Sequence, residues 1–227
     1  MPHVARSITR SAVALAALAA VTAFSFGGWA TISVEDVPES LRVGQPTTFR
    51  FTIRQHGIEP LEGLNPSLAI RSADGKSVVA AAASPDGAKG RYASTFTIPR
   101  SGDWRVTINS GFGPSKLTLL PIAANATGVS LAAMTDTERG KHLFVAKGCV
   151  GCHIHRAVDE RPPADMGAPE LTSKAFDNGY LALWLANPRI RPATKGGPEM
   201  PNPQLSQKEI APLVAFISSQ GRATASK

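Results

Sequence analysis

Cys149-Val150-Gly151-Cys152-His153 is the most informative segment in the C-terminal part of this 227-residue chain. It holds the only two cysteines of the sequence, and a histidine follows the second one directly. Two thiols at this spacing can each add to one vinyl group of a haem, which places the next imidazole beneath the iron. The pattern C-x-x-C-H is therefore typical of a covalently attached c-type haem.

Two other interpretations of the paired cysteines are less favoured. A redox-active dithiol of the thioredoxin kind is expected within a βαβ pattern, which this sequence does not show. A structural zinc site needs four ligands, whereas here there are only two cysteines, and His153 and His155 crowd the same few residues. We therefore expect one haem c, bound through Cys149 and Cys152 with His153 as the proximal iron ligand.

The charges of the chain exclude one class of partner. Lys and Arg number 24 against 17 Asp and Glu, and they are spread along the whole sequence. No basic block and no interleaving of basic with aromatic residues is present, so nucleic acid is not an expected partner. A mildly positive face for an acidic protein partner is compatible with this distribution, although the distribution does not demand one.

Residues 1–30 have the pattern of a secretory signal peptide. Arg6 and Arg10 precede an apolar run over residues 12–26, and Gly28-Trp29-Ala30 places small residues on both sides of a bulky one. This pattern predicts cleavage after Ala30 and export to the periplasm. The alternative is an uncleaved membrane anchor, but the run is shorter than the roughly 20 apolar residues of a spanning helix. Membrane contact is expected only in that second case.

Residues 31–121 alternate between apolar and polar side chains with the period of two that is typical of half-buried strands. The clearest runs cover residues 49–53, 92–98 and 104–108, and turn signals lie at 43–46, 74–75, 84–87 and 99–103. This punctuation predicts an antiparallel β-sandwich. The segment also resembles the small secreted immunoglobulin-like domains of the YtkA-like and FixH-like group, on the residues Gly90-Arg91-Tyr92, Pro99, Gly102 and Trp104. The resemblance implies fold alone.

Several domains of this architecture handle copper, but the predicted sandwich lacks the ligands for it. It contains no cysteine, no methionine and a single histidine, His56. A copper site needs soft sulfur ligands or several imidazoles. We interpret His56, which is followed by Gly57, as a residue of a surface turn, and the sandwich as a docking or positioning module.

Residues 122–134 are small and uncharged, which predicts a linker, and beyond them the period becomes helical. Thr135 and Glu138 predict a capping box that begins a helix ending near Lys147. A second amphipathic helix is expected over residues 178–186. Ser206 and Glu209 predict a further capping box, followed by an apolar stripe at Ile210, Leu213, Val214 and Ile217. Pro212 predicts a kink or a late start of that last helix.

Residues 135–227 resemble a small monohaem class I cytochrome c. The resemblance rests on Gly140-x-x-x-Phe144, the Cys149/Cys152/His153 site, Gly167-x-Pro169-x-Leu171, Tyr180-Leu181-x-x-Trp184-Leu185, Met200-Pro201-Asn202 and Leu213-Val214-x-Phe216. It implies an all-α domain in which Gly140 lets the first and last helices cross closely, so that Phe144 meets Phe216. It also agrees with export, because such haems are attached outside the bacterial cytoplasm.

Met200 is the expected sixth ligand of the iron. It lies in a loop rich in Pro and Gly, Gly196-Gly197-Pro198-Glu199-Met200-Pro201, and a rigid loop can hold a thioether against the iron. The competing candidates are Met134 in the linker, Met166, His142 and His155. We expect His155 on the same side of the haem as His153, and His142 exposed on its helix.

The resemblance also implies roles around the haem. The carbonyl of Pro169 would accept a hydrogen bond from Nδ1–H of His153, which fixes the orientation of the imidazole, and Leu171 would pack on the haem ring. Trp184 would either reach a haem propionate or pack in the core. Arg189 and Arg191 are read as solvated surface charges, with propionate neutralisation as the alternative.

Ligation by histidine and methionine saturates the iron and favours its ferrous state. We therefore predict an exported monohaem electron carrier, not itself an enzyme, that serves a donor and an acceptor protein which the sequence does not name. The alternatives are a haem-based sensor or ligand-binding protein and a haem subunit of a larger oxidoreductase complex. A single C-x-x-C-H excludes a two-haem peroxidase. Because every expected haem contact lies in residues 135–227, this part is expected to fold and bind haem alone.

Overall fold

The structure is a computed structural model that describes residues 28–126, 128, 132–159, 167–172, 174–190 and 199–225, with side chains to residue 219. The expected signal peptide up to residue 27 lies outside the described residues, as do Met166, Arg191 and residues 196–198 of the methionine loop. Within the described ranges, none of the helices has the length and apolar character needed to cross a membrane.

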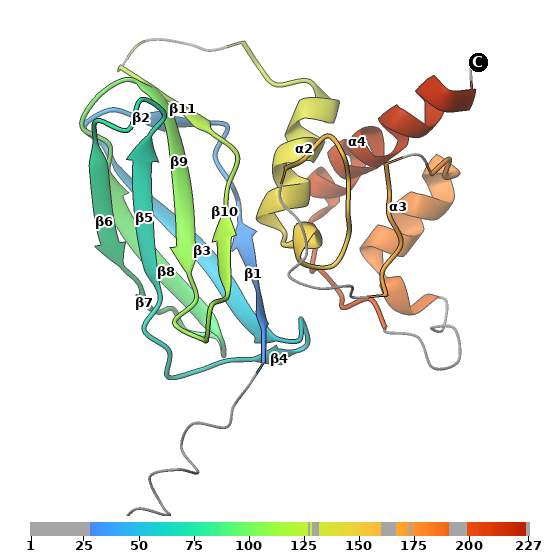
Figure 1. The fold of residues 1–227 in the computed structure, drawn as a ribbon, viewed down its shortest axis with the longest axis horizontal. Helices are drawn as coiled ribbons and strands as arrows, with labels where there is room; N and C mark the ends of the chain where they lie inside the picture. The colour runs from blue at the N-terminus through green and yellow to red at the C-terminus, as the bar shows by residue number, and fades with distance from the viewer. Residues whose placement is uncertain are drawn as a thin grey trace, which may run out of the picture.

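The N-terminal part is a sandwich of two β-sheets, and the C-terminal part is a group of helices beside it (Figure 1). All strand pairs are antiparallel except β2 with β11. The first sheet has the order β1 (Ala30–Glu35), β3 (Pro46–Gln55), β8 (Arg91–Thr97) and β7 (Ser84–Pro85), with β4 (Glu59–Pro60) on β3. The second has the order β2 (Ser40–Arg42), β11 (Ile122–Asn125), β9 (Gly102–Asn109), β5 (Ser67–Ser72) and β6 (Val78–Ala82), with β10 (Lys116–Thr118) on β9.

The predicted period of two produces the core between the sheets. Phe49, Phe51 and Ile53 on β3 are buried, and so are Trp104, Val106 and Ile108 on β9. Phe51 and Tyr92 stack across neighbouring strands with ring centroids 6.2 Å apart. The Tyr92 hydroxyl donates a hydrogen bond of 2.9 Å to the Leu61 carbonyl. The prediction of an antiparallel β-sandwich is therefore confirmed.

The predicted start of the linker at residue 122 is too early, because residues 122–125 form strand β11. Ile122 and Ala124 are buried, each 1% exposed, and β11 pairs with both β9 and β2. The physical reason is that this strand is short and alanine-rich, so its period of two has little contrast in hydrophobicity. A smaller difference concerns Ser84–Pro85, which form the short strand β7 where the sequence predicted only a turn.

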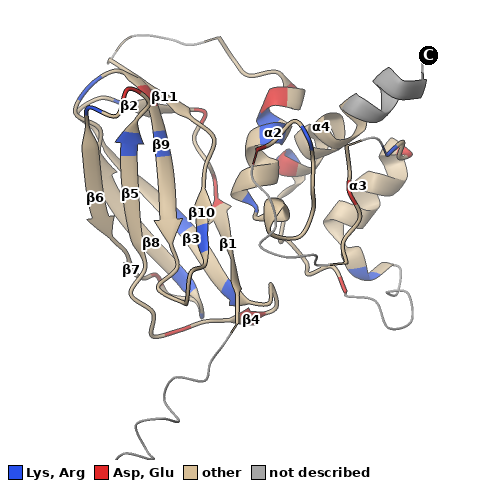
Figure 2. Ribbon diagram, in the orientation of Figure 1, with Lys and Arg blue, Asp and Glu red and all other residues tan. Residues whose placement is uncertain are grey.

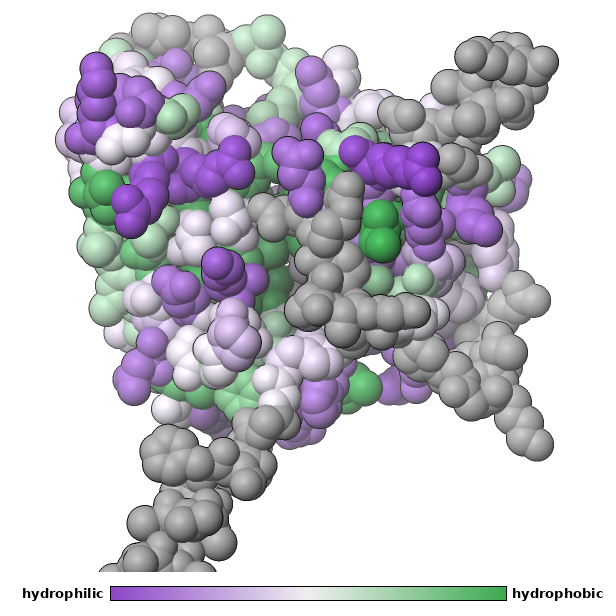
Figure 3. Space-filling model, in the orientation of Figure 1, coloured by the Kyte–Doolittle hydropathy of each residue, from purple (hydrophilic) through white to green (hydrophobic). Residues whose placement is uncertain are grey.

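Charges of both signs are scattered over the described molecule (Figure 2). Basic residues lie side by side on β5 and β9, where Arg71 is the direct cross-strand partner of Arg105. Figure 3 shows hydrophilic and hydrophobic residues interspersed over the face of the sandwich that it displays.

The helical part contains α2 (Asp136–Ala146), α3 (Asn178–Ala186) and α4 (Gln207–Ala225), with short 3₁₀ turns η2 (Cys149–Gly151) and η3 (Pro188–Ile190). The capping box of Thr135 and Glu138 is present at the start of α2. A late start of the last helix is wrong, because α4 begins at Gln207 and Pro212 lies inside it. A proline near the start of a helix removes one intrahelical hydrogen bond, which the rest of the helix can tolerate.

Helices α2 and α4 cross in close contact at Gly140, as the resemblance implied. A Cβ at this position would overlap the carbonyl oxygen of Pro212 and would lie 2.7 Å from Cβ of Phe216. The rings of Phe144 and Phe216 are 5.6 Å apart. The fold thus uses Gly140 to bring two backbones together behind the haem-attachment segment.

The sandwich and the helical part pack against each other where α2 contacts β1, an edge strand of the first sheet, and β10 of the second sheet (Figure 1). The ion pair of Lys208 with Asp36, at 2.8 Å, and the ion pair of Arg139 with Glu39 link the two parts. Their buried apolar residues form one continuous cluster. The two parts therefore share buried surface, and the folding and haem binding of residues 135–227 alone stays a prediction.

Candidate functional site

The Cys149–His153 stretch follows directly on helix α2. Lys147 caps the helix, and Gly148 then adopts a left-handed conformation with φ of 76°, which turns the chain into η2. The carbonyl of Cys149 accepts hydrogen bonds from the backbone N–H of Cys152 at 3.1 Å and of His153 at 2.8 Å. This tight turn holds both cysteines and the histidine in one short, hydrogen-bonded piece of backbone.

Both cysteines of the turn are free and half-buried. Burial raises the pKa of Cys149 to about 12 and also raises the pKa of Cys152. Burial disfavours the charged thiolate, so both side chains are neutral thiols near neutral pH. Two reduced thiols on one turn are the groups that form thioethers with the vinyl groups of a haem.

The imidazole of His153 is held by the chain segment that the resemblance implied. Its Nδ1 lies 2.9 Å from the carbonyl oxygen of Pro169, where it can act only as a donor. The segment is itself tied to the turn, because the N–H of Leu171 donates to the carbonyl of Ile154 at 2.9 Å. Leu171 is buried. Burial lowers the pKa of His153, and the Pro169 carbonyl opposes this only in part. A neutral ring with Nδ1 engaged leaves the lone pair of Nε2 available to a metal ion.

Met200 and Trp184 are brought together. Nε1–H of Trp184, on helix α3, donates to Sδ of Met200 at 3.1 Å. Neither expected role of Trp184, contact with a propionate or core packing, included this bond. Trp184 is only half-buried, and its ring lies 6.3 Å from that of Tyr180, which is exposed. The structure therefore makes Trp184 a partner of the candidate axial ligand.

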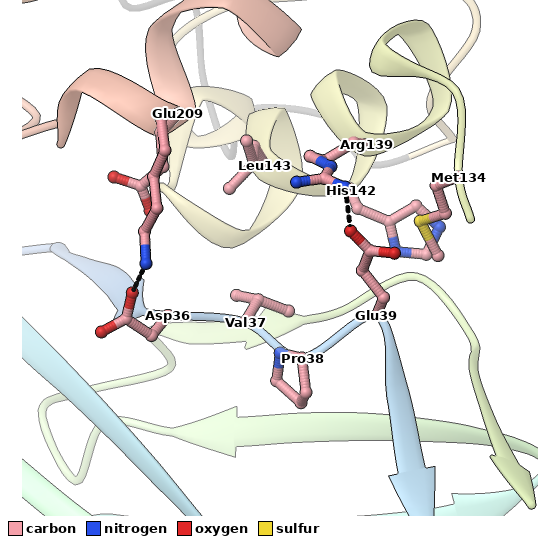
Figure 4. Close-up of a pocket in the computed structure, with 10 residues that line it drawn as sticks. Asp36, Val37, Pro38, Glu39, Met134, Arg139, His142, Leu143 and Glu209 are labelled. Carbon is pink, nitrogen blue, oxygen red and sulfur yellow. Dashed lines mark ion pairs between the residues drawn. The ribbon is translucent and has the colours of Figure 1, made fainter. Parts of the chain in front are cut away.

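The competing ligand candidates lie elsewhere where the structure describes them. Met134 and His142 line a cleft of about 170 Å³ between the sandwich and the helices (Figure 4). His142 was expected to be exposed but is half-buried there, because the sandwich covers this end of α2, and burial lowers its pKa. Arg189 is a surface residue that pairs with Glu199 at 3.5 Å.

His155 is enclosed in the helix crossing. Its ring lies 4.3 Å from that of Phe216 and 5.8 Å from that of Phe144. Nδ1 accepts a hydrogen bond from the N–H of Ala157 at 3.3 Å, and Nε2 is buried without a hydrogen-bond partner among the described residues. The side chain is therefore a packed part of the core behind the turn.

A buried ion pair that no sequence pattern predicted lies beside the haem-attachment turn. Nζ of Lys147 lies 2.7 Å from the Glu209 carboxylate, and the two side chains are only 5% and 8% exposed. The same carboxylate accepts hydrogen bonds of 2.8 Å from the backbone N–H and the hydroxyl of Ser206. Burial by itself raises the pKa of Glu209, but the bonds from Lys147 and Ser206 outweigh it and hold the pKa below the ordinary value. The capping pattern at Ser206 was the only signal of this role in the sequence.

The residues present fit one covalently bound haem. They supply two reduced thiols on one turn, an imidazole whose Nδ1 is engaged, and a thioether that accepts a hydrogen bond from Trp184. Histidine with methionine is one of the established axial ligand pairs of cytochromes c.

Comparison with known proteins gives a family for the helical part. Residues 137–221 match the family model described as Cytochrome c. A search of curated proteins gives no match.

Among solved structures, the Lin-41 filamin domain is similar at 18% identity and a TM-score of 0.33, over 43% of this chain and 90% of that one. Superoxide reductase (neelaredoxin) from Ignicoccus hospitalis has 20% identity and a TM-score of 0.29, over 42% and 80%. Domains 4 and 5 of the S-layer protein SbsC have 19% identity and a TM-score of 0.28, over 42% and 50%.

The family match, the C-x-x-C-H turn and the helix crossing at Gly140 concern the same stretch of chain. Residues 137–221 therefore form a cytochrome c domain, a domain that carries one covalently attached haem c, and a β-sandwich precedes it in this chain.

Proposed function

We propose that this protein is an exported carrier of single electrons whose iron is ligated by His153 and Met200. The observation that carries the proposal is the pair of hydrogen bonds that orient the two ligands. Pro169 engages Nδ1 of His153 at 2.9 Å, and Trp184 donates to Sδ of Met200 at 3.1 Å. Both ligands are thus oriented by neutral partners from other parts of the domain.

The haem supplies a reversible one-electron change of its iron, and the residues decide what else can happen there. Two protein ligands leave no open position for oxygen or peroxide, and a thioether favours the ferrous state. None of the named residues has to give or take a proton in such a transfer. The arrangement suits electron transfer without bond chemistry, in which the protein passes electrons from a donor protein to an acceptor protein.

Export is the second part of the proposal, and it rests on the signal pattern of the first 30 residues. In the structure, Ala30 is already the first residue of β1, and its N–H donates to Oγ of Ser115 at 2.9 Å. Cleavage after Ala30 would remove this contact, whereas cleavage a few residues upstream would keep it. N-terminal sequencing of the protein purified from the periplasm measures which of the two occurs.

The test of the electron-transfer proposal is the reaction of the loaded protein with external ligands. The ferrous protein should not bind carbon monoxide, and the ferric protein should not bind cyanide at modest concentration, because Met200 occupies the sixth position. The protein should also exchange one electron per haem in a potentiometric titration. Rapid binding of carbon monoxide to the native ferrous protein would contradict the proposal and would favour the haem-based sensor.

A further inference from the structure

The turn that follows β3 of the sandwich touches the loop that carries Met200. Gly57, in this turn, is buried and has φ of 77°. A Cβ on Gly57 would lie 2.7 Å from Cγ and 3.4 Å from Cβ of Pro201, the residue directly after Met200. The Pro201 ring therefore packs against the backbone of Gly57. A larger residue at position 57 would not fit without moving the loop that carries Met200.

A second contact ties the same loop to β3. Nη2 of Arg54 donates a hydrogen bond of 2.6 Å to Oε1 of Gln204. Gln204 is one of few non-glycine residues with positive φ, at 54°, and its N–H donates to Oδ1 of Asn202 at 2.8 Å. The loop after Met200 is thus a tight turn, and the hydrogen bond from Arg54 ties it to the sandwich.

The same end of the sandwich also touches the turn that carries His153. A Cβ on Gly148 would lie 2.7 Å from the carbonyl oxygen of Ile32 on β1, and one on Gly151 would lie 3.8 Å from Cγ2 of Thr31. In the ladder between the strands, Thr31 pairs with Arg54 and Ile32 with Ile53. The residues that touch the His153 turn therefore lie on β1, and Arg54, which touches the methionine loop, lies on β3. These two strands are hydrogen-bonded to each other, so they move together.

We propose that this end of the sandwich, with Gly57 and Arg54 as positioning residues, holds the methionine loop in place against the haem. The inference rests on the proposed function, because it takes Met200 as the axial ligand. Trp184 holds the sulfur of Met200 from the helical part, and the sandwich holds Pro201 and Gln204 directly after it. A ligand on a loop is held in productive geometry only when its neighbours are locked by packing and hydrogen bonds. The sandwich thus sets how firmly Met200 is bound.

Gly57→Ala in the full-length, haem-loaded protein is the first test, with Gly44→Ala as its matched control. Gly44 has almost the same φ, 75°, but a Cβ there would have no neighbour within 4 Å. Both substitutions carry the same kind of backbone strain, and only Gly57→Ala pushes on Pro201. The readouts are the weak far-red absorption of ferric iron bound to a thioether and the reduction potential.

We expect Gly57→Ala to lose at least half of the far-red absorption and to lower the potential, because a displaced thioether favours the ferrous state less. Gly44→Ala should keep the absorption and the potential of the parent and lose only stability. A folded Gly57→Ala protein with the parent's absorption and potential would overturn the inference. So would an equal loss of absorption in Gly44→Ala.

Arg54→Met is the second variant, and it decides the question if Gly57→Ala does not accumulate as a folded protein. It removes the hydrogen bond to Gln204 without adding volume. Its control is Arg71→Met, an exposed arginine on β5. We expect a smaller but measurable loss of far-red absorption for Arg54→Met, no change for Arg71→Met, and partial recovery in Arg54→Lys, which keeps a donor. Identical spectra and potentials for Arg54→Met and Arg71→Met would contradict the inference.

Met200→Ala separates failure of this inference from failure of the proposed function. If Met200→Ala abolishes the far-red absorption while Gly57→Ala and Arg54→Met leave it unchanged, Met200 is the ligand and the sandwich does not position it. If Met200→Ala itself leaves the absorption unchanged, Met200 is not the ligand and both proposals are wrong.

Discussion

The buried ion pair of Lys147 with Glu209 joins the end of α2 to the first turn of α4, directly before the haem-attachment turn. Both side chains are nearly inaccessible to water, and their charged atoms are 2.7 Å apart. Replacing one partner leaves the other charge buried without compensation, which costs about 3–5 kcal/mol. We therefore expect Glu209→Gln to lower the free energy of unfolding by about 3 kcal/mol, the lower end of that range, because the amide can still accept one hydrogen bond.

The pH dependence of this effect has a definite sign. The pKa of Glu209 in the folded protein lies below its ordinary value of 4.5. A carboxylate with a depressed pKa stabilises the folded state above its unfolded pKa, and this stabilisation is lost as the pH falls through its folded pKa. The difference in stability between the parent and Glu209→Gln should therefore be complete at pH 7 and should shrink once the pH falls below 4.5.

The assay is guanidinium unfolding of the haem-loaded proteins, followed by circular dichroism and by haem absorbance. The control is Glu62→Gln, which breaks the exposed pair of Glu62 with Lys89, whose side chains are 61% and 75% exposed. Exposed pairs contribute at most about 1 kcal/mol. The double variant Lys147→Met/Glu209→Leu removes both charges and should recover part of the loss, because apolar replacement of a buried pair is often neutral whereas Ser206 still loses its acceptor. Equal losses of unfolding free energy in Glu209→Gln and Glu62→Gln would show that the buried pair contributes no more than the exposed one.

Three further predictions concern the rest of the domain. Gly140→Ala should force α2 away from Pro212 of α4 and lower the free energy of unfolding by about 1–3 kcal/mol in the same assay. An unchanged free energy of unfolding would contradict this prediction. Trp184→Phe keeps a ring but removes the N–H donated to Met200, so the far-red absorption of the ferric protein should shift or weaken while the haem content stays constant. Residues 135–227 expressed alone with an export signal should still attach haem through Cys149 and Cys152. They should unfold at a lower denaturant concentration than the full chain, because the surface that packs on the sandwich is uncovered. Equal unfolding midpoints would show that the two parts are independent.

Much of the local structure could be predicted because its signals lie within a few residues of each other. The alternation at Phe49, Phe51 and Ile53 predicted a buried strand, and Thr135 with Glu138 predicted the start of α2. The C-x-x-C-H turn predicted the haem. Strand β11 was not predicted, because its alanines give little contrast in hydrophobicity between the two faces of a strand.

The contacts that tie the two parts together could not be predicted, because their residues are far apart in the chain. Arg54 and Gln204 are separated by 150 positions, and nothing in either neighbourhood points to the other. The bond from Trp184 to Met200 was missed for a different reason. In the sequence, an aromatic residue at helical spacing fits core packing as well as it fits a bond to a ligand. Only the arrangement of α3 against the methionine loop shows that Trp184 donates to Met200.

The far-red absorption of the ferric protein reports whether Met200 completes the coordination of the iron, as proposed. The parent should show the weak thioether-to-iron absorption. Met200→Ala should keep its covalently bound haem, lose this absorption, bind carbon monoxide in the ferrous state and have a lower reduction potential. A parent without the absorption, or a Met200→Ala variant that retains it together with the parent's potential, would show that Met200 is not the sixth ligand.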